Sequence, residues 1–362
     1  MATMLFAGAF GLSAVLTALA MRMAPRLGLV AHPTADRYHR TVVPLGGGIA
    51  IFGTLAASII GVFAAAWFLW APGCLPWLGK AANVNPKDFF NHGTELGWIL
   101  VCAFALFALG LWDDKRRLGP FLKLAVQLAV AIIAAGPADI RVAFFIENRL
   151  IASLLSALWI TLIINAFNFL DNIDGASAGI AAIASSILFI ASAISGQIFV
   201  SGLALIFVGA LLGFLAFNFP PARIFMGDAG SLVVGFFVAI LTIRTTYYHQ
   251  AQSGQWYRVL MPLVVMAVPL YDFISVTVLR ISQGKSPFVG DTQHFSHRLI
   301  RRGLTDTQTV LTLYLATLCT GLSAVFLYQV NLTGAVLIFV QTIMVLGIVA
   351  ILEGANRNER IP

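Results

Sequence analysis

Six carboxylates in short polar motifs are the residues of this chain best suited to chemistry. They are drawn from only 15 Asp and Glu in 362 residues, and each lies next to an apolar segment. A carboxylate beside hydrocarbon is costly to keep ionised, so it is usually paired, bound to a metal ion or functional. Helix capping could explain any one of them, but not a doubled Asp, a DxxD pair and a Gly-flanked Asp together. The six are Asp113, Asp114, Asp171, Asp174, Asp228 and Asp291.

Amide and carboxylate side chains recur at helical spacing between residues 165 and 175. Asn165, Asn168 and Asp171 would lie on one stripe of a helix, because residues three or four apart share a face. Oxygen ligands of this kind suit a hard cation such as Mg²⁺. The alternative is a polar stripe that holds neighbouring helices together.

A Pro-Pro pair followed by a Gly-rich turn marks the segment 218–231. We expect the pair to end one helix and the turn to start the next, with Asp228 and Ser231 at its N-terminus. Free N–H groups and the positive dipole end at that position favour a diphosphate, and Asp228 can hold the metal ion that bridges phosphate oxygens. Phe225 is placed to stack on a base.

Basic and imidazole side chains accompany these acids. Lys115 and the two arginines after it could neutralise the repelling pair Asp113 and Asp114, as could a bound cation. Further along, His294 and His297 would face together on a helix. Two His alone are weak support for zinc, and phosphate or sugar binding fits better. The other candidate donors are Arg37, His39, Lys123, Arg298, Arg301 and Arg302.

Composition indicates which elements position these residues. Hydrophobic residues make up 59% of the chain, charged residues 10%, and the mean hydropathy is +0.91, so too few charges are available to cover a soluble exterior. We therefore predict an all-α, polytopic membrane protein with about eleven transmembrane helices. They would form one integral-membrane domain, 1–352, followed by a short cytoplasmic tail, 353–362. The predicted spans are 3–24, 45–70, 95–112, 119–136, 150–168, 176–195, 197–217, 229–246, 258–280, 308–329 and 333–352.

Lys and Arg predict the orientation. If the N-terminus is outside, 16 of the 22 lie in segments that face the cytosol, a distribution that the positive-inside rule favours. The N-terminus is thus predicted to be periplasmic, the C-terminus cytoplasmic and the acidic motifs cytosolic. The net charge of +7 is an orientation signal rather than a nucleic-acid footprint. The first apolar run shows no cleavage site of a signal peptide, and three scattered Cys suggest packing roles.

From about residue 29 to residue 303, these stretches resemble in order the polyprenyl-phosphate N-acetylhexosamine-1-phosphate transferases. That superfamily also includes the phospho-MurNAc-pentapeptide translocase. Its Phe-Met-Gly-Asp-x-Gly-Ser pattern matches residues 225–231 without departure. Its pattern of Asp-Asp and then Lys-Leu-x-x-Gln is matched by Asp113, Asp114, Lys123, Leu124 and Gln127.

The chain departs from the family pattern at a few polar positions. Asn172 replaces a usual Gly in Asn-x-x-Asn-Phe-x-Asp-Gly-x-Asp-Gly, and Ser296 replaces the middle His of a His-x-His-His segment. Residues 36–39 read Asp-Arg-Tyr-His where Arg-Lys-x-His is common. The three consecutive His of the translocase are missing, and Gly-Lys-Ser-Pro-Phe at 284–288 looks like the sugar-initiating branch. The resemblance therefore favours UDP-GlcNAc, or a related UDP-N-acetylhexosamine, over the pentapeptide nucleotide.

The resemblance implies a glycosyl-1-phosphate transferase of the bacterial inner membrane that depends on Mg²⁺, with Mn²⁺ as an alternative ion. Its partners would be a UDP-N-acetylhexosamine, undecaprenyl phosphate, the bilayer and, by resemblance only, a second copy in a homodimer. No nucleic acid is expected. The lipid phosphate would attack the β-phosphorus and release UMP, which starts a lipid-linked cell-envelope glycan. Asp228 and Asn168 would hold the metal, and Asp113, Asp114 and Lys123 would act near the acceptor phosphate. The residues that bind or order the nucleotide sugar would be Lys115, Asn165, Asp171, Asp174, Phe225, His294, His297, Arg298, Arg301 and Arg302.

Two other classes of protein fit the residues less well. The sequence from Asp171 to Ala178 copies the start of the CDP-alcohol phosphotransferase signature, but the later Asp residues of that signature are missing. An ion-coupled transporter would also hold intramembrane Asp, such as Asp272 after Pro269. Transporters, however, concentrate polar residues near the bilayer midplane and often contain a two-fold repeat. This chain places them at span ends, and we find no repeat.

Overall fold

The protein is described by a computed structural model over residues 1–31, 42–70, 90–141, 146, 148–245, 256–286 and 293–354. Apart from one short β pair and a few single-turn helices, the described chain is a bundle of α-helices, which confirms the predicted all-α fold. The pair joins β1 (Val30–Ala31) antiparallel to β2 (Val43–Pro44).

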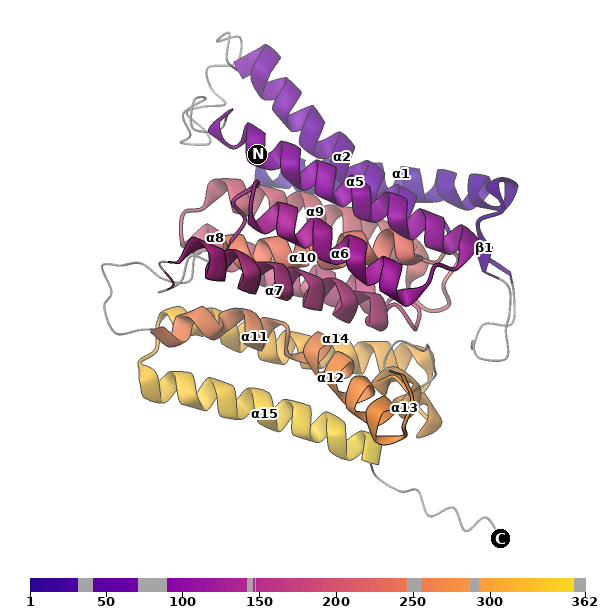
Figure 1. Cartoon of the computed structure of the whole chain (residues 1–362), viewed down its shortest axis with the longest axis vertical. Coiled ribbons are helices and arrows are strands. Elements are labelled where there is room, and N and C mark those ends of the chain that lie inside the picture. The colour runs from indigo at the N-terminus through magenta and orange to yellow at the C-terminus, as the bar shows by residue number, and fades with distance from the viewer. Residues whose placement is uncertain are drawn as a thin grey trace.

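The helices lie side by side in two groups that follow the chain order (Figure 1). The first group consists of α1 (Ala2–Met23), α2 (Gly47–Ala65), α5 (Gly93–Arg116), α6 (Pro120–Ala135), α7 (Arg149–Leu170), α8 (Ala176–Ile194), α9 (Ile198–Asn218) and α10 (Asp228–Arg244). The second group consists of α11 (Met261–Val265), α12 (Ala267–Ser282), α13 (Phe295–Arg301), α14 (Asp306–Val325) and α15 (Leu332–Gly354).

A helix lies at each of the eleven predicted spans, and the ninth is broken between α11 and α12 by a bend of 67°. Within the described residues, eight helices are long and apolar enough to cross a membrane, or nine if the bent pair counts as one. Helix α6 has only 16 residues and α10 only 17, fewer than the roughly 20 that a full crossing needs. A multi-pass helical membrane protein is confirmed, whereas eleven crossings and their orientation remain predictions.

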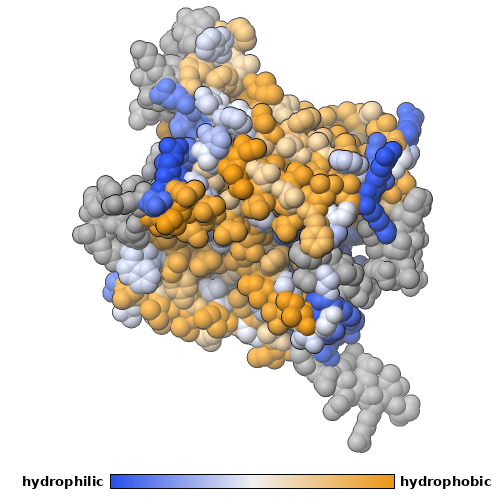
Figure 2. All heavy atoms as spheres, in the orientation of Figure 1, coloured by the Kyte–Doolittle hydropathy of each residue, from blue (hydrophilic) through white to orange (hydrophobic). Residues whose placement is uncertain are grey.

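Helix α10 is the central element of the first group. All of its residues from Ala229 to Thr242 are buried, and it packs against α2, α5, α7, α8 and α9. A helix that is apolar all round must lie inside protein or lipid, and here its neighbours supply the protein. The outer helices instead expose large apolar side chains, and Figure 2 shows hydrophobic residues over most of the visible face, with hydrophilic ones mainly near the helix ends.

Glycines bring α2 and α5 against the backbone at the start of α10. A Cβ added at Gly110 of α5 would lie 2.4 Å from the Ala229 nitrogen, and one at Gly48 of α2 would lie 2.4 Å from the Gly230 nitrogen. Such distances leave no room for any side chain, so glycine is required by the close approach of the helices. The N-terminus of α10 is therefore held from two sides.

The Pro-Gly segment at the start of α2 supports the chain segment that leads into α10. The Phe225 N–H donates to the Pro44 carbonyl at 2.9 Å, and the Gly47 and Gly48 N–H groups donate to the carbonyls of Phe225 (3.0 Å) and Met226 (2.9 Å). These bonds satisfy backbone groups of both irregular segments and fix residues 225–227 beside α2.

Candidate active site

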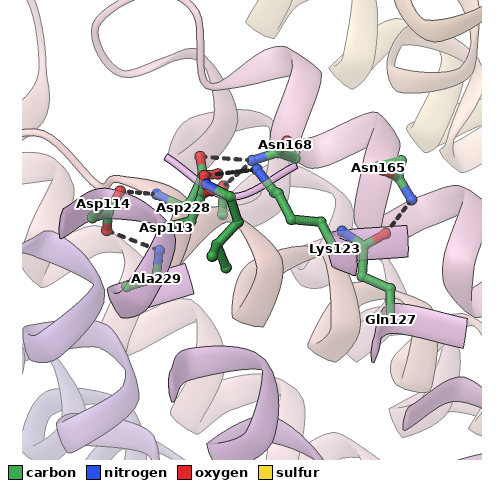
Figure 3. A network of polar contacts seen from close by, with 10 residues as sticks. Asp113, Asp114, Lys123, Gln127, Asn165, Asn168, Asp228 and Ala229 are labelled. Carbon is green, nitrogen blue, oxygen red and sulfur yellow. Dashed lines mark hydrogen bonds and ion pairs between the residues drawn. The ribbon is translucent and has the colours of Figure 1, made fainter. Parts of the chain in front are cut away.

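Four helix ends meet where the polar motifs converge (Figure 3). Asp113 and Asp114 lie in the last turns of α5, Lys123 near the start of α6, Asn168 near the end of α7, and Asp228 at the start of α10. Helix α5 continues four residues past its predicted end, so both Asp residues are held on a helix rather than in a loop. The polar motifs thus lie at helix ends, and the helices position the side chains of the site.

Lys123 is the link between two of the carboxylates. Its Nζ lies 2.9 Å from Asp113 Oδ2 and also pairs with Asp228 Oδ2. The side chains of Asp113, Lys123 and Asp228 are only 14%, 19% and 27% exposed, so these charges interact where water screens them little. The second oxygen of Asp113 accepts from the Leu118 N–H at 2.5 Å, which fixes its carboxylate.

Asn168 contacts the opposite side of the Asp228 carboxylate. Its Nδ2 donates to Asp228 Oδ1 at 3.1 Å and to Ser231 Oγ at 2.8 Å. The two residues predicted to share a metal ion, Asn168 and Asp228, are therefore adjacent although 60 positions separate them.

Asp114 has a different environment from its neighbour. Its two oxygens accept from the N–H groups of Asp228 at 2.8 Å and Ala229 at 3.1 Å. The next two N–H groups of α10, at Gly230 and Ser231, donate to the Gly227 carbonyl. The expected free N–H groups for a diphosphate at this helix start are thus already partnered, because a carboxylate of the protein occupies the place expected for the phosphate.

Asn165 lies one turn before Asn168 on α7. Its Nδ2 donates to Gln127 Oε1 at 2.7 Å and to the Thr161 carbonyl at 2.8 Å. The buried Gln127 comes from α6, so this bond joins the helices that carry Lys123 and Asn168. The contact matches the helix-joining alternative for this stripe, and a substrate contact of Asn165 remains a prediction.

The turn between α7 and α8 carries the DxxD pair and is tied to three other segments. Asp174 Oδ2 accepts from the Ala222 N–H at 2.8 Å, and the Gly175 N–H donates to Asn218 Oδ1 at 3.1 Å. The Gly175 carbonyl accepts from the Tyr314 hydroxyl at 2.6 Å. Gly175 has φ +74°, a conformation that glycine adopts without strain.

The expected His pair is confirmed as a feature of one helix start. His294 immediately precedes α13, and its ring lies 6.3 Å from that of His297. His294 Nδ1 lies 3.0 Å from Asp272 Oδ2, and the Phe295 N–H donates to Asp272 Oδ1 at 2.9 Å. Asp272, fully buried in α12, therefore fixes the start of α13.

Two of the predicted arginines are engaged within the second group. Arg298 contacts Ser275 Oγ at 2.8 Å and Glu353 Oε2 at 3.2 Å, and Arg302 Nε donates to the Glu353 carbonyl at 3.0 Å. Arg301 and Lys115 are exposed. The predicted donors Arg37 and His39 and the carboxylate Asp291 lie outside the described residues.

Phe169 connects the carboxylate cluster to the second group of helices. It directly follows Asn168, and its ring lies 5.1 Å from that of Phe273 and 5.5 Å from that of His294. The Arg280 guanidinium lies over the same ring at 5.0 Å. The two sets of candidate residues are thus neighbours through α7.

The donor atoms fit a hard cation that also binds phosphate. Asp113 and Asp228 supply carboxylate oxygens, Asn168 an amide, and the Lys123 ammonium already lies between the two carboxylates. No group of three or more His, Cys, Asp or Glu that could hold a metal ion occurs among the described residues. Mg²⁺ is commonly held by one or two carboxylates together with substrate phosphates, and these residues suit that mode.

Comparison with known proteins finds a family whose model matches the segment that holds this site. Residues 96–246, which span α5 to α10, match the model of glycosyl transferase family 4. This segment contains Asp113, Asp114, Lys123, Asn168 and Asp228. The match confirms the family resemblance of the motifs, and it covers the whole carboxylate cluster.

Curated relatives extend the similarity to nearly the full chain. A probable undecaprenyl-phosphate N-acetylglucosaminyl 1-phosphate transferase of Bacillus subtilis is 29% identical over 94% of this chain and 88% of its own. A decaprenyl-phosphate N-acetylglucosaminephosphotransferase of Mycobacterium leprae is 28% identical over 95% and 88%. An undecaprenyl-phosphate alpha-N-acetylglucosaminyl 1-phosphate transferase of Salmonella typhi is 26% identical over 82% and 76%.

Some residues of the site could not be assigned from the sequence. Asp272 was visible as an intramembrane carboxylate, but nothing in the sequence paired it with His294. Asn218 and Tyr314, which hold the DxxD turn, carry no signal that separates them from ordinary packing residues. Glu353 was assigned to the tail, whereas it lies in α15 and binds α13.

Proposed function

We propose that this protein transfers N-acetylglucosamine 1-phosphate from a UDP-sugar to undecaprenyl phosphate at the cytoplasmic face of a bacterial inner membrane. The supporting observation is the cluster of Asp113, Lys123, Asn168 and Asp228, which four helices assemble inside the segment that matches the family. The names of the relatives supply the sugar and the prenyl phosphate.

The reaction joins two anions. An oxygen of the lipid phosphate forms a bond to the β-phosphorus of the donor, the bond from that phosphorus to the bridging oxygen breaks, and the electron pair leaves with UMP. A phosphate monoester has a second pKa near 6, so the nucleophile is already largely deprotonated at neutral pH. The main task of the site is therefore to reduce charge repulsion and to align the reactants.

The residues divide this task by position. Asp228 and Asn168, with Asp113 nearby, would hold Mg²⁺, which when bound supplies positive charge to the diphosphate oxygens. Lys123 can exchange a carboxylate partner for a phosphate oxygen, because it lies between Asp113 and Asp228. Asp114 acts as a positioning residue, since both of its oxygens already bind the start of α10.

The direct test is a donor panel with purified protein and undecaprenyl phosphate, with the lipid product identified by mass. UDP-GlcNAc should give a lipid diphosphate that carries one N-acetylhexosamine, together with one equivalent of UMP. Product from UDP-MurNAc-pentapeptide instead would assign the chain to the translocase. No product, and no exchange of labelled UMP into any UDP-N-acetylhexosamine, would overturn the proposal.

A further inference from the structure

Two positions at which the chain departs from the family pattern contact one another. The Ser296 hydroxyl donates to Asn172 Oδ1 at 2.5 Å, across 124 positions of sequence. Asn172 lies in the DxxD turn after α7, and Ser296 lies in α13 between the two His. Asn172 Nδ2 also donates to the Phe169 carbonyl at 2.5 Å, so one amide binds both the end of α7 and the start of α13.

The backbone explains what a glycine at position 172 would change. Among the described residues, Asp139 is the only one other than glycine that has a positive φ, so Asn172 occupies an ordinary conformation. A glycine here would therefore be needed for space and not for its backbone freedom. The residue across this space is Ser296, which is 2% exposed and stands where the pattern has a larger His.

The two departures thus exchange volume across one half-buried contact. By the resemblance these two positions would hold Gly and His, whereas here they hold Asn and Ser, so the larger side chain lies on the turn and the smaller one on α13. Swaps that conserve volume are tolerated in packed interiors, whereas a single enlargement forces neighbours to move. The hydrogen bond adds a direct link between the turn and α13.

The contact joins the two parts of the site predicted to hold the nucleotide sugar. Asn172 lies in the same turn as Asp171 and Asp174. Its partner Ser296 directly precedes His297 in α13, and Asp272 of α12 binds the start of that helix. The Asn172–Ser296 pair is therefore the direct side-chain hydrogen bond between the turn and the helix that carries His297.

We propose that Asn172 and Ser296 form a matched pair that positions α13 against the DxxD turn and thereby determines how the sugar nucleotide is bound. This inference rests on the proposed function for its substrate. Neither residue is assigned to the chemical step, so the pair should govern KM for the donor more than kcat.

A double-mutant cycle tests the pair. Ser296→His alone should lower kcat/KM for UDP-GlcNAc on the order of 100-fold, because an imidazole must displace Asn172. Asn172→Gly alone should lower it about tenfold through the lost hydrogen bond. The double variant should return to within about fivefold of the parent, whereas independent effects would give a loss of about 1000-fold.

The same four proteins should be compared for thermal stability in detergent, because that measurement does not depend on turnover. Recovery of stability and of KM in the double variant supports the pair. Additive losses in both overturn it, and recovery of stability without recovery of KM overturns its role in substrate binding. If the parent makes no lipid product with any donor, the proposed function fails, and the stability cycle still decides whether the residues are matched.

Ser192→Ala provides a matched control. This buried hydroxyl lies 3.1 Å from that of Ser201 between α8 and α9, away from both segments of the pair. Its loss should lower thermal stability and leave KM within about twofold of the parent. A comparable rise in KM for this control would show that KM follows general destabilisation, which would overturn the positioning role.

Discussion

At the scale of single residues, Asp228 has the largest number of roles. It begins α10, pairs with Lys123 and accepts from Asn168, so its carboxylate contacts two other residues of the cluster. Replacing it with Asn keeps the size of the side chain and removes the charge. The substitution should therefore lower the rate of the reaction and leave the stability of the fold nearly unchanged.

We expect Asp228→Asn to lower kcat at least about 100-fold, which is the typical fall in kcat when one preorganised electrostatic group is removed from an active site. Thermal stability in detergent should change little. Asp139→Asn is the control, because Asp139 also forms ion pairs, with Arg141 and Arg149, near the opposite end of α6. Activity of the parent level in Asp228→Asn would remove this residue from the metal site.

Asp114 should behave differently from Asp113. Asp114→Ala leaves the N–H groups of Asp228 and Ala229 without their acceptor, which should lower the free energy of unfolding by roughly 2 kcal/mol. Asp114→Asn retains one carbonyl acceptor and should lose less. Thermal denaturation of both variants checks the order, and equal stability of Asp114→Ala and the parent would contradict it.

The residue types of the site could be predicted from the sequence, but the contacts that each residue makes could not. The spacing of Asn165 and Asn168 on one helix predicted a shared stripe, and both side chains do bond to neighbouring helices, Asn165 to α6 and Asn168 to α10. Which of two adjacent Asp residues caps α10 depends on how α5 packs against α10, and sequence spacing carries no such information. The same limit hid the contact between Asp272 and His294.

At the scale of elements, glycine contacts determine where the site residues lie. Gly110→Ala should separate α5 from α10, because its Cβ would lie 2.4 Å from the Ala229 nitrogen. We expect a loss of about 1–3 kcal/mol in stability together with a reduced kcat, since Asp113 and Asp228 would move apart.

Gly97→Ala is the matched control on the same helix. A Cβ at this position would meet no atom within 4 Å. It should leave stability unchanged or raise it by up to about 1 kcal/mol, because alanine favours the helix. Equal effects of the two substitutions would show that close approach at Gly110 does not position the site.

Helix positions were predicted better than helix ends. Long apolar runs mark all eleven segments, because each must bury or expose a continuous apolar surface. The end of α5 was placed too early, since two adjacent Asp residues suggest a loop. Their partners, Lys123 and the start of α10, lie far along the chain and stabilise them in helical conformation. The bend between α11 and α12 was also not predicted.

At the scale of the whole molecule, α1 begins at one end of the bundle and α15 ends at the other (Figure 1). If the two ends of the bundle lie on opposite sides of the membrane, the chain crosses it an odd number of times, as predicted from the sequence. Lys and Arg are concentrated at the end that holds the carboxylate cluster, so we predict that this end is cytosolic.

Cysteine labelling can check that orientation. In a variant whose three cysteines are replaced by Ala, Lys115→Cys and Asp139→Cys would place one exposed thiol at each end of the bundle. An impermeant thiol reagent should label Asp139→Cys in intact cells and Lys115→Cys only after the membrane is opened. The reverse pattern would place the site outside the cytosol.

Metal removal is the corresponding test of the proposed cofactor. Excess chelator should abolish lipid product formation, and added Mg²⁺ should restore it, because repulsion between two phosphate groups would otherwise be uncompensated. Thermal stability should remain unchanged, since Lys123 already pairs with Asp113 and Asp228. Full turnover in chelator would exclude the metal role.

The complete burial of α10 has a consequence for how variation can accumulate in this protein. A lipid-facing helix such as α1 or α15 offers many positions at which one apolar residue can replace another. Helix α10 offers almost none between Ala229 and Thr242, because every side chain there meets protein. A saturation library scored by growth or product yield should therefore find intolerance along its whole length, and a periodic pattern of tolerance in the peripheral helices.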